Sequence, residues 1–421
     1  MLDRTKAPDF KTLTNLTVPK IQLVKLPNGV TLYHFRSDNV EVVKIEFVFD
    51  AGTWFEKVSS ASFFTGKSFL SGTQKRKSNE ILELIDFYGA FTELNHGPDF
   101  ISLAVYLPSK NISNLVPLLE ELIFESIFPE EEIKLKKAQK VQQIELEEKK
   151  NNVLASKKFR EILFEPNHPY GRRITKRDIK DVNRAQIIEH YQKHVIGKSF
   201  KIFLAGNFSN DQLKEIEYSF GKRKHSNSEN KQYFPVDTKE VQNVKIDKSG
   251  NQASIRLGSF VIKHNHEDFL KFQFLNTVLG GYFGSRLIKN IREEKGLTYG
   301  IFSSLVNLKN KTYLAISTES KRDSIDMVLE QVYHEIKKLK DQPIPYDELQ
   351  TTKNYLLGAF QRSFDNSISI VDRHKKAILF DYDDDYFNNY LDTINSTTSE
   401  ECIRIANEYF NEKEFSSVIV S

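Results

Sequence analysis

Two short segments with the same pattern decide the organisation of this chain. They are Pro129-Glu130-Glu131-Glu132-Ile133 and Pro345-Tyr346-Asp347-Glu348-Leu349, and each places carboxylates directly after a proline. That combination indicates the start of a helix. After the first segment, Glu and Lys recur at helical spacing as far as residue 164. We therefore expect a long helix at the equivalent position of each half.

The segments around these two helices repeat as well. Each half contains, in order, a strand, a polar turn, a helix, the long helix and a final apolar strand. The strand, turn and helix that come first fall at 100–107, 109–110 and 114–124 in one half and at 311–317, 320–322 and 324–339 in the other. The final strands fall at 200–205 and 415–420. Two copies of one α+β unit explain this order.

The apolar pattern stops between the two halves. From residue 221 to residue 240 the chain is polar, beginning with the run GKRKHSN, which is typical of a flexible linker. We therefore predict an N-terminal domain at 1–220, a linker at 221–240 and a C-terminal domain at 241–421.

The composition argues against several classes of function. The chain has 421 residues with 60 basic and 57 acidic side chains, so charge gives no reason to expect binding to nucleic acid. The single cysteine, Cys402, excludes an intrachain disulfide and a thiolate zinc cluster. The first ten residues are polar, and no stretch approaches 18 uninterrupted apolar residues. We therefore expect a cytoplasmic protein without a membrane partner.

Several further motifs follow one another along the chain. They are DAGT at 50–53, SGT at 71–73, HPYGR at 168–172, AGNF at 205–208, GSRL at 284–287 and IREEKGLTY at 291–299. This ordered set resembles the M16 zinc metallopeptidases, the family of pitrilysin and the mitochondrial processing peptidase, over roughly residues 18–421. The resemblance implies the LuxS/MPP-like metallohydrolase fold. That fold has two homologous α+β domains, each a mixed, mostly antiparallel sheet with helices packed on one face.

The N-terminal half departs from the family at its zinc motif. M16 peptidases carry H-x-x-E-H on a helix, where two histidines bind zinc and the glutamate activates the bound water. The matching helix here places Phe63 and Lys67 at the histidine positions and Gly66 at the glutamate position. Phenylalanine has no donor atom, glycine has no side chain, and lysine is protonated near neutral pH. We therefore expect this chain to bind no zinc.

Other candidate metal ligands do not complete a site. Three glutamates fall where the third ligand of the family lies: Glu145, Glu147 and Glu148. The sequence does not distinguish among them, and we interpret them as salt-bridging residues of a solvated helix face. His190 and His194 share a helix face but lack a glutamate between them, so we assign them a surface or packing role. We expect His264, in an apparent loop, to be exposed to solvent.

Arg292 and Tyr299 stand seven residues apart in the last motif. In M16 enzymes an arginine and a tyrosine of this motif face the zinc across the chamber. Arginine holds peptide carbonyls with a fork of donors, and tyrosine donates a hydrogen bond to the developing oxyanion. Composition alone favours an exposed helix residue and a packing aromatic. The resemblance favours the functional interpretation, in which both residues bind substrate.

Some M16 enzymes are heterodimers in which one subunit has lost the zinc motif but keeps the arginine and the tyrosine. This chain is similar to that subunit. The resemblance implies a non-catalytic protein, inactive alone, that binds a peptide or small protein along the strand at 89–95 while a zinc-bearing M16 partner holds the metal. One alternative is a scaffold or assembly protein of the same fold with no role in proteolysis. Another is an enzyme with a relocated metal site, for which the sequence offers too few ligands.

Overall fold

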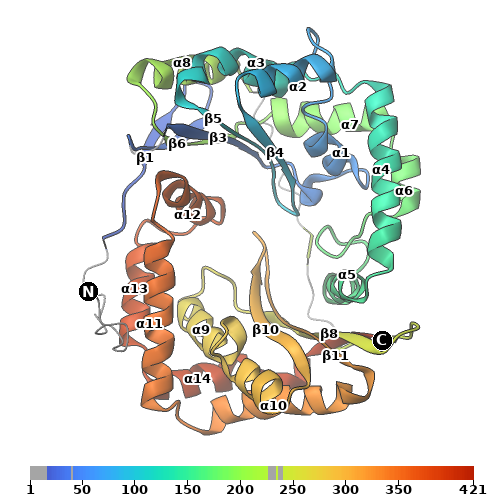
Figure 1. The fold of residues 1–421 in the computed structure, drawn as a ribbon, viewed down its shortest axis with the longest axis vertical. Helices are drawn as coiled ribbons and strands as arrows, with labels where there is room; N and C mark the ends of the chain where they lie inside the picture. Colours follow the sequence, from blue (N-terminus) through green and yellow to red (C-terminus); the bar gives the residue numbers. More distant parts are fainter. Residues whose placement is uncertain (1–16, 39–40, 226–233, 236–239) are drawn as a thin grey trace, which may run out of the picture.

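The computed structural model describes residues 17–38, 41–225, 234–235 and 240–421. Two six-stranded sheets lie in opposite halves of the molecule (Figure 1). The first half of the chain, blue to green, builds one sheet, and the second half, yellow to red, builds the other. Helices cover the outer side of each sheet, and further helices lie between the two sheets. This is the two-domain α+β architecture that the repeat predicted.

The first sheet has the strand order β1-β2-β6-β3-β5-β4. Its strands are β1 (Gln22–Lys25), β2 (Thr31–Arg36), β3 (Val42–Phe49), β4 (Phe91–His96), β5 (Ile101–Pro108) and β6 (Lys201–Gly206). Only β2 and β6 run parallel, and the other neighbours are antiparallel. Strand β4 stands at the edge and, among the described residues, pairs with β5 alone.

The helices of the first half follow the predicted order. They are α1 (Ala61–Lys67), α2 (Ser78–Phe87), α3 (Ile112–Phe124), α4 (Glu130–Glu148), α5 (Asn151–Phe164), α6 (Lys176–Asp181), α7 (Arg184–Tyr191) and α8 (Asn210–Gly221). Side chains alternate across β3, so Ile45 and Phe47 enter the core that α3 and α8 also line. The single helix expected at 130–164 is two helices, because the backbone becomes extended at Lys150.

The second sheet has the order β10-β11-β8-β12-β7, with the short β9 also paired to β11. Its strands are β7 (Asn243–Ile246), β8 (Gln252–Gly258), β9 (Phe260–Val261), β10 (Thr298–Asn307), β11 (Thr312–Lys321) and β12 (Ser416–Val420). Its helices are α9 (Phe269–Asn276), α10 (Ile325–Asp341), α11 (Tyr346–Arg362), α12 (Ser367–Leu379), α13 (Tyr386–Ser396) and α14 (Ser399–Tyr409). Strand β10 stands at one edge of this sheet, as β4 does in the first sheet.

One helix of each half packs against the sheet of the other half. Helix α5 packs on β8 and β12 of the second sheet, where Phe159 joins Val418 in one apolar cluster. Helix α12 packs on β2 and β6 of the first sheet, where Val371 contacts the cluster that contains Phe203. Helix α5 follows the long helix α4, and α12 follows the long helix α11, so the two crossing helices occupy equivalent positions in the internal repeat. Their packing buries apolar surface between the halves and fixes their relative position.

A buried charge cluster strengthens the contact of α12 with the first sheet. On β3, Lys44 and Glu46 are each almost completely buried and lie 2.9 Å apart. Lys44 also pairs with Asp372 of α12 at 2.7 Å, and Lys375 of α12 pairs with Glu46 at 2.5 Å. The two lysines and two carboxylates neutralise one another, which is the condition under which buried charges are tolerated.

A second polar contact joins the halves at the HPYGR motif. The Tyr170 hydroxyl donates to Asp99 at 2.5 Å and accepts from the backbone N–H of Asn310 at 3.3 Å. Asp99 also accepts from the backbone N–H of Lys309, so it holds the turn between β10 and β11. Trp54 packs against Tyr170 with ring centroids 4.8 Å apart. The motif tyrosine therefore positions the second half of the chain on the first.

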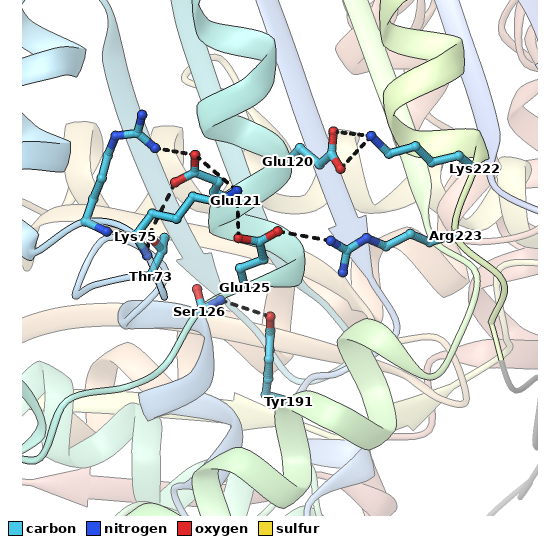
Figure 2. Close-up of polar contacts among 10 residues, drawn as sticks. Thr73, Lys75, Glu120, Glu121, Glu125, Ser126, Tyr191, Lys222 and Arg223 are labelled. Carbon is cyan, nitrogen blue, oxygen red and sulfur yellow. Dashed lines mark hydrogen bonds and ion pairs between the residues drawn. The ribbon is translucent and has the colours of Figure 1, made fainter.

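Carboxylates of α3 fasten the end of α8 (Figure 2). Glu120 pairs with Lys222 at 2.8 Å, and Glu125, which directly follows α3, pairs with Arg223 at 3.1 Å. Glu121 instead pairs with Arg76, which precedes α2. Lys222 and Arg223 directly follow α8, at the start of the predicted linker. Most of that linker, 221–240, lies outside the described residues. Within the described part of the chain, no helix is both long and apolar enough to cross a membrane.

Candidate functional site

Helix α1 carries the three positions of the altered zinc motif. Phe63 and Lys67 are four residues apart, so they share a helix face, and both line one cavity. Gly66 faces the sheet instead, where a Cβ atom would lie 3.1 Å from Cγ2 of Ile101. A glutamate at that position would require Ile101 to move. The local packing is therefore built around glycine.

The side chains that replace the zinc ligands have found other partners. Phe63 packs against the ring of His96 with centroids 5.6 Å apart. The ammonium of Lys140 lies 4.5 Å from the centroid of the Phe63 ring. The Nζ of Lys67 donates a hydrogen bond to the carbonyl oxygen of Leu94 on the edge strand β4. The described residues contain no group of three or more His, Cys, Asp or Glu side chains arranged to hold a metal.

The cavity in front of α1 has a volume of about 300 Å³. It lies between α1, α4, α5, the end of β4 and the segment 169–174. Six basic side chains line it: Lys67, Lys140, Lys157, Arg160, Arg172 and Arg173. The lining contains only two carboxylates, Glu56 and Glu147, which leaves an excess of four positive charges. The place of the zinc site is therefore a cationic cavity.

Burial and mutual repulsion act on the ionisable groups of this cavity. Burial, and then the charge of Lys136, lower the pKa of Lys67. Burial also lowers the pKa of Lys140, with Lys157 and Lys67 adding to the effect against Glu147. Desolvation, followed by the charges of Lys67 and Lys140 among others, lowers the pKa of the half-buried His96 to about 3. The imidazole of His96 is therefore neutral near neutral pH.

One of the three candidate third ligands faces the cavity. Glu147 lines it and forms an ion pair with Lys157 at 2.6 Å. Glu145 instead pairs with Lys176 on the surface, and Glu148 lies outside this lining. The sequence did not show which of the three glutamates faces the cavity, and the structure shows that Glu147 does. Its carboxylate is neutralised by a lysine and is not available to a metal.

A buried polar chain lies behind α1. The Ser62 hydroxyl donates to Oε1 of Glu56 at 2.5 Å and lies 2.7 Å from Nε2 of His96. Because Ser62 gives its proton to Glu56, Nε2 of His96 is the donor to Ser62. Burial raises the pKa of Glu56, against the Ser62 hydrogen bonds and Arg172, whose guanidinium lies 2.8 Å away. Ser62 is fully buried, and the imidazole of His96 donates to its oxygen instead of accepting its proton, so this chain supports α1 and is not a nucleophilic site.

Three further histidines considered as metal ligands or surface residues are structural. His190 and His194 are both buried, with ring centroids 4.8 Å apart, and His190 bonds the carbonyl of Ala51 at 2.9 Å. They have the packing role that their spacing suggested. The prediction for His264 was wrong, because the side chain is buried and bonds the carbonyl of Phe380 at 2.8 Å.

Arg292 and Tyr299 lie in the second half beside the edge strand β10. Arg292 sits in a π-helical turn (Ile288–Glu294), and its guanidinium lies 4.4 Å from the ring centroid of Phe283. Tyr299 is the second residue of β10 and is 92% exposed. Among the described residues, neither the Arg292 guanidinium nor the Tyr299 hydroxyl has an ion-pair or hydrogen-bond partner. Phe302, 48% exposed, extends this surface along β10.

The sequence analysis missed the basic residues that α4 and α5 contribute to the cavity. The clearest case is Lys140. It stands seven residues after Ile133 and four before Ile144, both of which are buried, so it lies on the buried stripe of α4. A lysine on the apolar stripe of an otherwise polar helix is therefore the sequence feature that could have indicated a lysine facing the cavity. No comparable pattern marks Arg160.

Two family models match the chain. The model of the insulinase-type M16 peptidases matches residues 34–184, and the model of the inactive M16 peptidase domain matches residues 181–356. The chain belongs to the M16 peptidase family. A Bacillus subtilis relative described as the uncharacterized zinc protease YmxG is 23% identical over 91% of this chain and 94% of its own length. A Helicobacter pylori relative described as the non-peptidase homolog YmxG is 28% identical over 44% of this chain and 43% of its own length.

Solved structures share the fold over nearly the whole chain. The inactive M16 peptidase domain from Pseudomonas fluorescens has a TM-score of 0.86 at 18% identity and covers 96% of this chain and 98% of its own. A protease from Helicobacter pylori has a TM-score of 0.87 at 16% identity, with coverages of 96% and 100%. A chain of complex III2 from Candida albicans has a TM-score of 0.78 at 14% identity, with coverages of 95% and 96%. At these identities the likeness concerns the fold.

Proposed function

We propose that this chain is the non-catalytic, peptide-binding subunit of a heterodimeric M16-type zinc metallopeptidase. It supplies Arg292 and Tyr299 to the zinc site of a partner subunit that carries the intact motif. One observation carries this proposal. The chain has replaced all three residues of its own zinc motif, yet it presents an arginine and a tyrosine of the family motif with their polar groups unengaged.

The surroundings of the pair suit an interaction with another chain. A tyrosine that is 92% exposed leaves a large apolar ring in water, and such residues are enriched where proteins meet. Phe302, on the same strand, and Phe283, which stacks on Arg292, are exposed as well. Stacking on Phe283 holds the Arg292 guanidinium without using its hydrogen-bond donors. Those donors are free to hold a peptide carbonyl.

Strand β4 supplies a surface for the peptide backbone. Among the described residues its outer edge pairs with no strand, so an extended peptide finds unpaired backbone donors and acceptors there. This strand corresponds to the segment 89–95 singled out in the sequence. Its exposed residues alternate along the strand, which leaves room for alternate side chains of a bound peptide.

The test is reconstitution with an M16 chain that has an intact H-x-x-E-H motif and comes from the same cell. Cleavage of a quenched fluorogenic peptide is measured for each chain alone and for the mixture. We expect the mixture to exceed the sum of the separate activities. Tyr299→Phe should lower turnover by roughly 10²-fold, the scale for one lost oxyanion donor. Arg292→Ala should change both KM and turnover, because its charge also positions the peptide.

A matched control is Tyr218→Phe, which changes an exposed tyrosine on α8, far along the chain from the motif. It should leave turnover unchanged. Circular dichroism checks that every variant is folded. Wild-type turnover in both Tyr299→Phe and Arg292→Ala would remove the proposed role of the pair.

The second candidate is a scaffold protein of the same fold with no role in proteolysis. The observation that favours it is the likeness to a chain of complex III2, which covers 95% of this chain. A scaffold would form a stable complex without raising the peptidase activity of any partner. Affinity purification followed by the same cleavage assay separates the two candidates.

A further inference from the structure

We propose that the cavity which replaces the zinc site is an anion pocket that selects peptides by a carboxylate group. Lys67, Lys140 and Arg160 are the binding residues. The inference rests on the proposed peptide-binding function and specifies the class of peptide. It predicts a preference for an acidic side chain, or for a free C-terminal carboxylate, near the α1 end of strand β4.

The charge balance of the cavity is the first argument. Three of its six basic residues are already paired: Lys157 with Glu147, Arg172 with Glu56, and Arg173 with Glu161. Lys67, Lys140 and Arg160 have no carboxylate within ion-pair distance among the residues that the structure describes. Three unpaired cations converge on one cavity of about 300 Å³. Charged residues of a solvated helix face would instead point into water, away from one another.

The second argument is that these cations are held at an energetic disadvantage. Lys67 and Lys140 are partly buried, and burial lowers the pKa of each. The charge of Lys67 also lowers the pKa of Lys140, and both lysines lower that of His96. An ammonium group gains from an anion most where water is limited and other cations are near. A site that is unfavourable when empty and neutralised when occupied is typical of a binding site.

The third argument concerns the position of Lys67. Its Nζ donates to the carbonyl oxygen of Leu94, a residue of the edge strand β4. A peptide that pairs with this edge therefore lies within reach of the lysine. A hydrogen bond from an ammonium to a carboxylate is stronger than one to a neutral carbonyl. The lysine can exchange Leu94 for the carboxylate of an arriving peptide.

A carboxylate also fits the other walls of the cavity. Phe63 and Ile144 supply apolar surface for the methylene groups that carry the charge. His96 is neutral and its Nε2 lies 2.7 Å from Ser62, so the positive charge of the pocket comes from the lysines and arginines. Arg160 adds a planar fork of donors that matches the two oxygens of a carboxylate.

The experiment compares eight-residue peptides by isothermal titration calorimetry with the full chain. All are N-acetylated and rich in alternating valine and threonine. One has a central aspartate and an amidated C-terminus, the second has asparagine in its place, and the third combines asparagine with a free C-terminal carboxylate. We expect the aspartate peptide or the free-carboxylate peptide to bind at least about tenfold more tightly than the neutral one, as one charge-assisted hydrogen bond implies. The stronger of the two identifies the source of the carboxylate.

The variants Lys67→Met and Lys140→Met should each abolish most of this preference while neutral-peptide binding persists. Lys134→Met is the matched control, because Lys134 is an exposed lysine of the same helix as Lys140 and does not line the cavity. Equal binding of all three peptides would overturn the anion pocket and leave the proposed function standing. A preference that survives both cavity variants would also overturn it. Binding of no peptide would overturn both proposals.

Discussion

Replacing Lys44 by methionine is expected to weaken the contact between the two halves of the chain. Lys44→Met keeps an unbranched side chain at a position that is 4% exposed. It removes the ammonium that lies 2.9 Å from Glu46 and 2.7 Å from Asp372. The carboxylate of Glu46 then depends on Lys375 of α12, and the cluster changes from neutral to negative.

The expected loss follows from burial and from the partner that remains. Removing one member of a buried ion pair costs about 3 to 5 kcal/mol, because the other charge stays buried. Lys375 still pairs with Glu46 and Asp372, at 2.5 and 2.8 Å, and Asp372 is partly screened by water. We therefore expect the lower end of the range, about 3 kcal/mol. Urea unfolding followed by the fluorescence of Trp54 measures it, since this single tryptophan is buried beside Tyr170.

The matched control is Lys57→Met, which removes an exposed lysine that pairs with Glu189 at 3.1 Å. Surface pairs contribute little, so the control should lose less than about 0.5 kcal/mol. A loss below about 1 kcal/mol for Lys44→Met, or equal losses for both variants, would refute the view that the buried cluster holds the two halves together.

Two further predictions concern stability. Burial lowers the pKa of His190 to about 4, so below pH 6.5 the unfolded chain binds more protons than the folded one. Stability should therefore fall as the pH falls, by about 2 kcal/mol at pH 5 for this group, and His190→Gln should flatten that slope in urea titrations. Gly206→Ala should cost on the order of 4 kcal/mol, because φ is +125° and the new Cβ would lie 2.3 Å from the carbonyl oxygen of Val42. Gly250→Ala, with a similar φ but nothing within 4 Å, should cost about 1 kcal/mol, and a similar loss in both would contradict the steric explanation.

The repeated elements were predictable from the sequence because their signals are local. Proline followed by carboxylates located the starts of α4 and α11, and apolar runs located β6 and β12. The packing of α5 and α12 on the sheet of the other half was not predictable. Periodicity shows that a helix has an apolar face, but it does not show which sheet that face covers.

The site was predictable at α1 and much less so around it. The spacing of Phe63, Gly66 and Lys67 showed that the zinc ligands are gone, since that argument needs only the residue types. The cationic cavity depends on side chains from α1, α4 and α5, such as Lys67, Lys140 and Arg160. These residues are far apart in the sequence and come together only in the folded chain. Likewise, only the structure shows that Glu147 faces the cavity and Glu145 does not.

The most direct test of the central claim is the zinc content of the isolated chain and of its complex with the motif-bearing partner. Both are dialysed without chelator and analysed by elemental mass spectrometry. The motif positions hold Phe63, Gly66 and Lys67, and Lys67 is engaged with a backbone carbonyl, so the isolated chain should contain no stoichiometric zinc. The active complex should contain one zinc per pair of chains, held by the partner. One zinc per isolated chain, or two zinc ions per pair, would contradict the account.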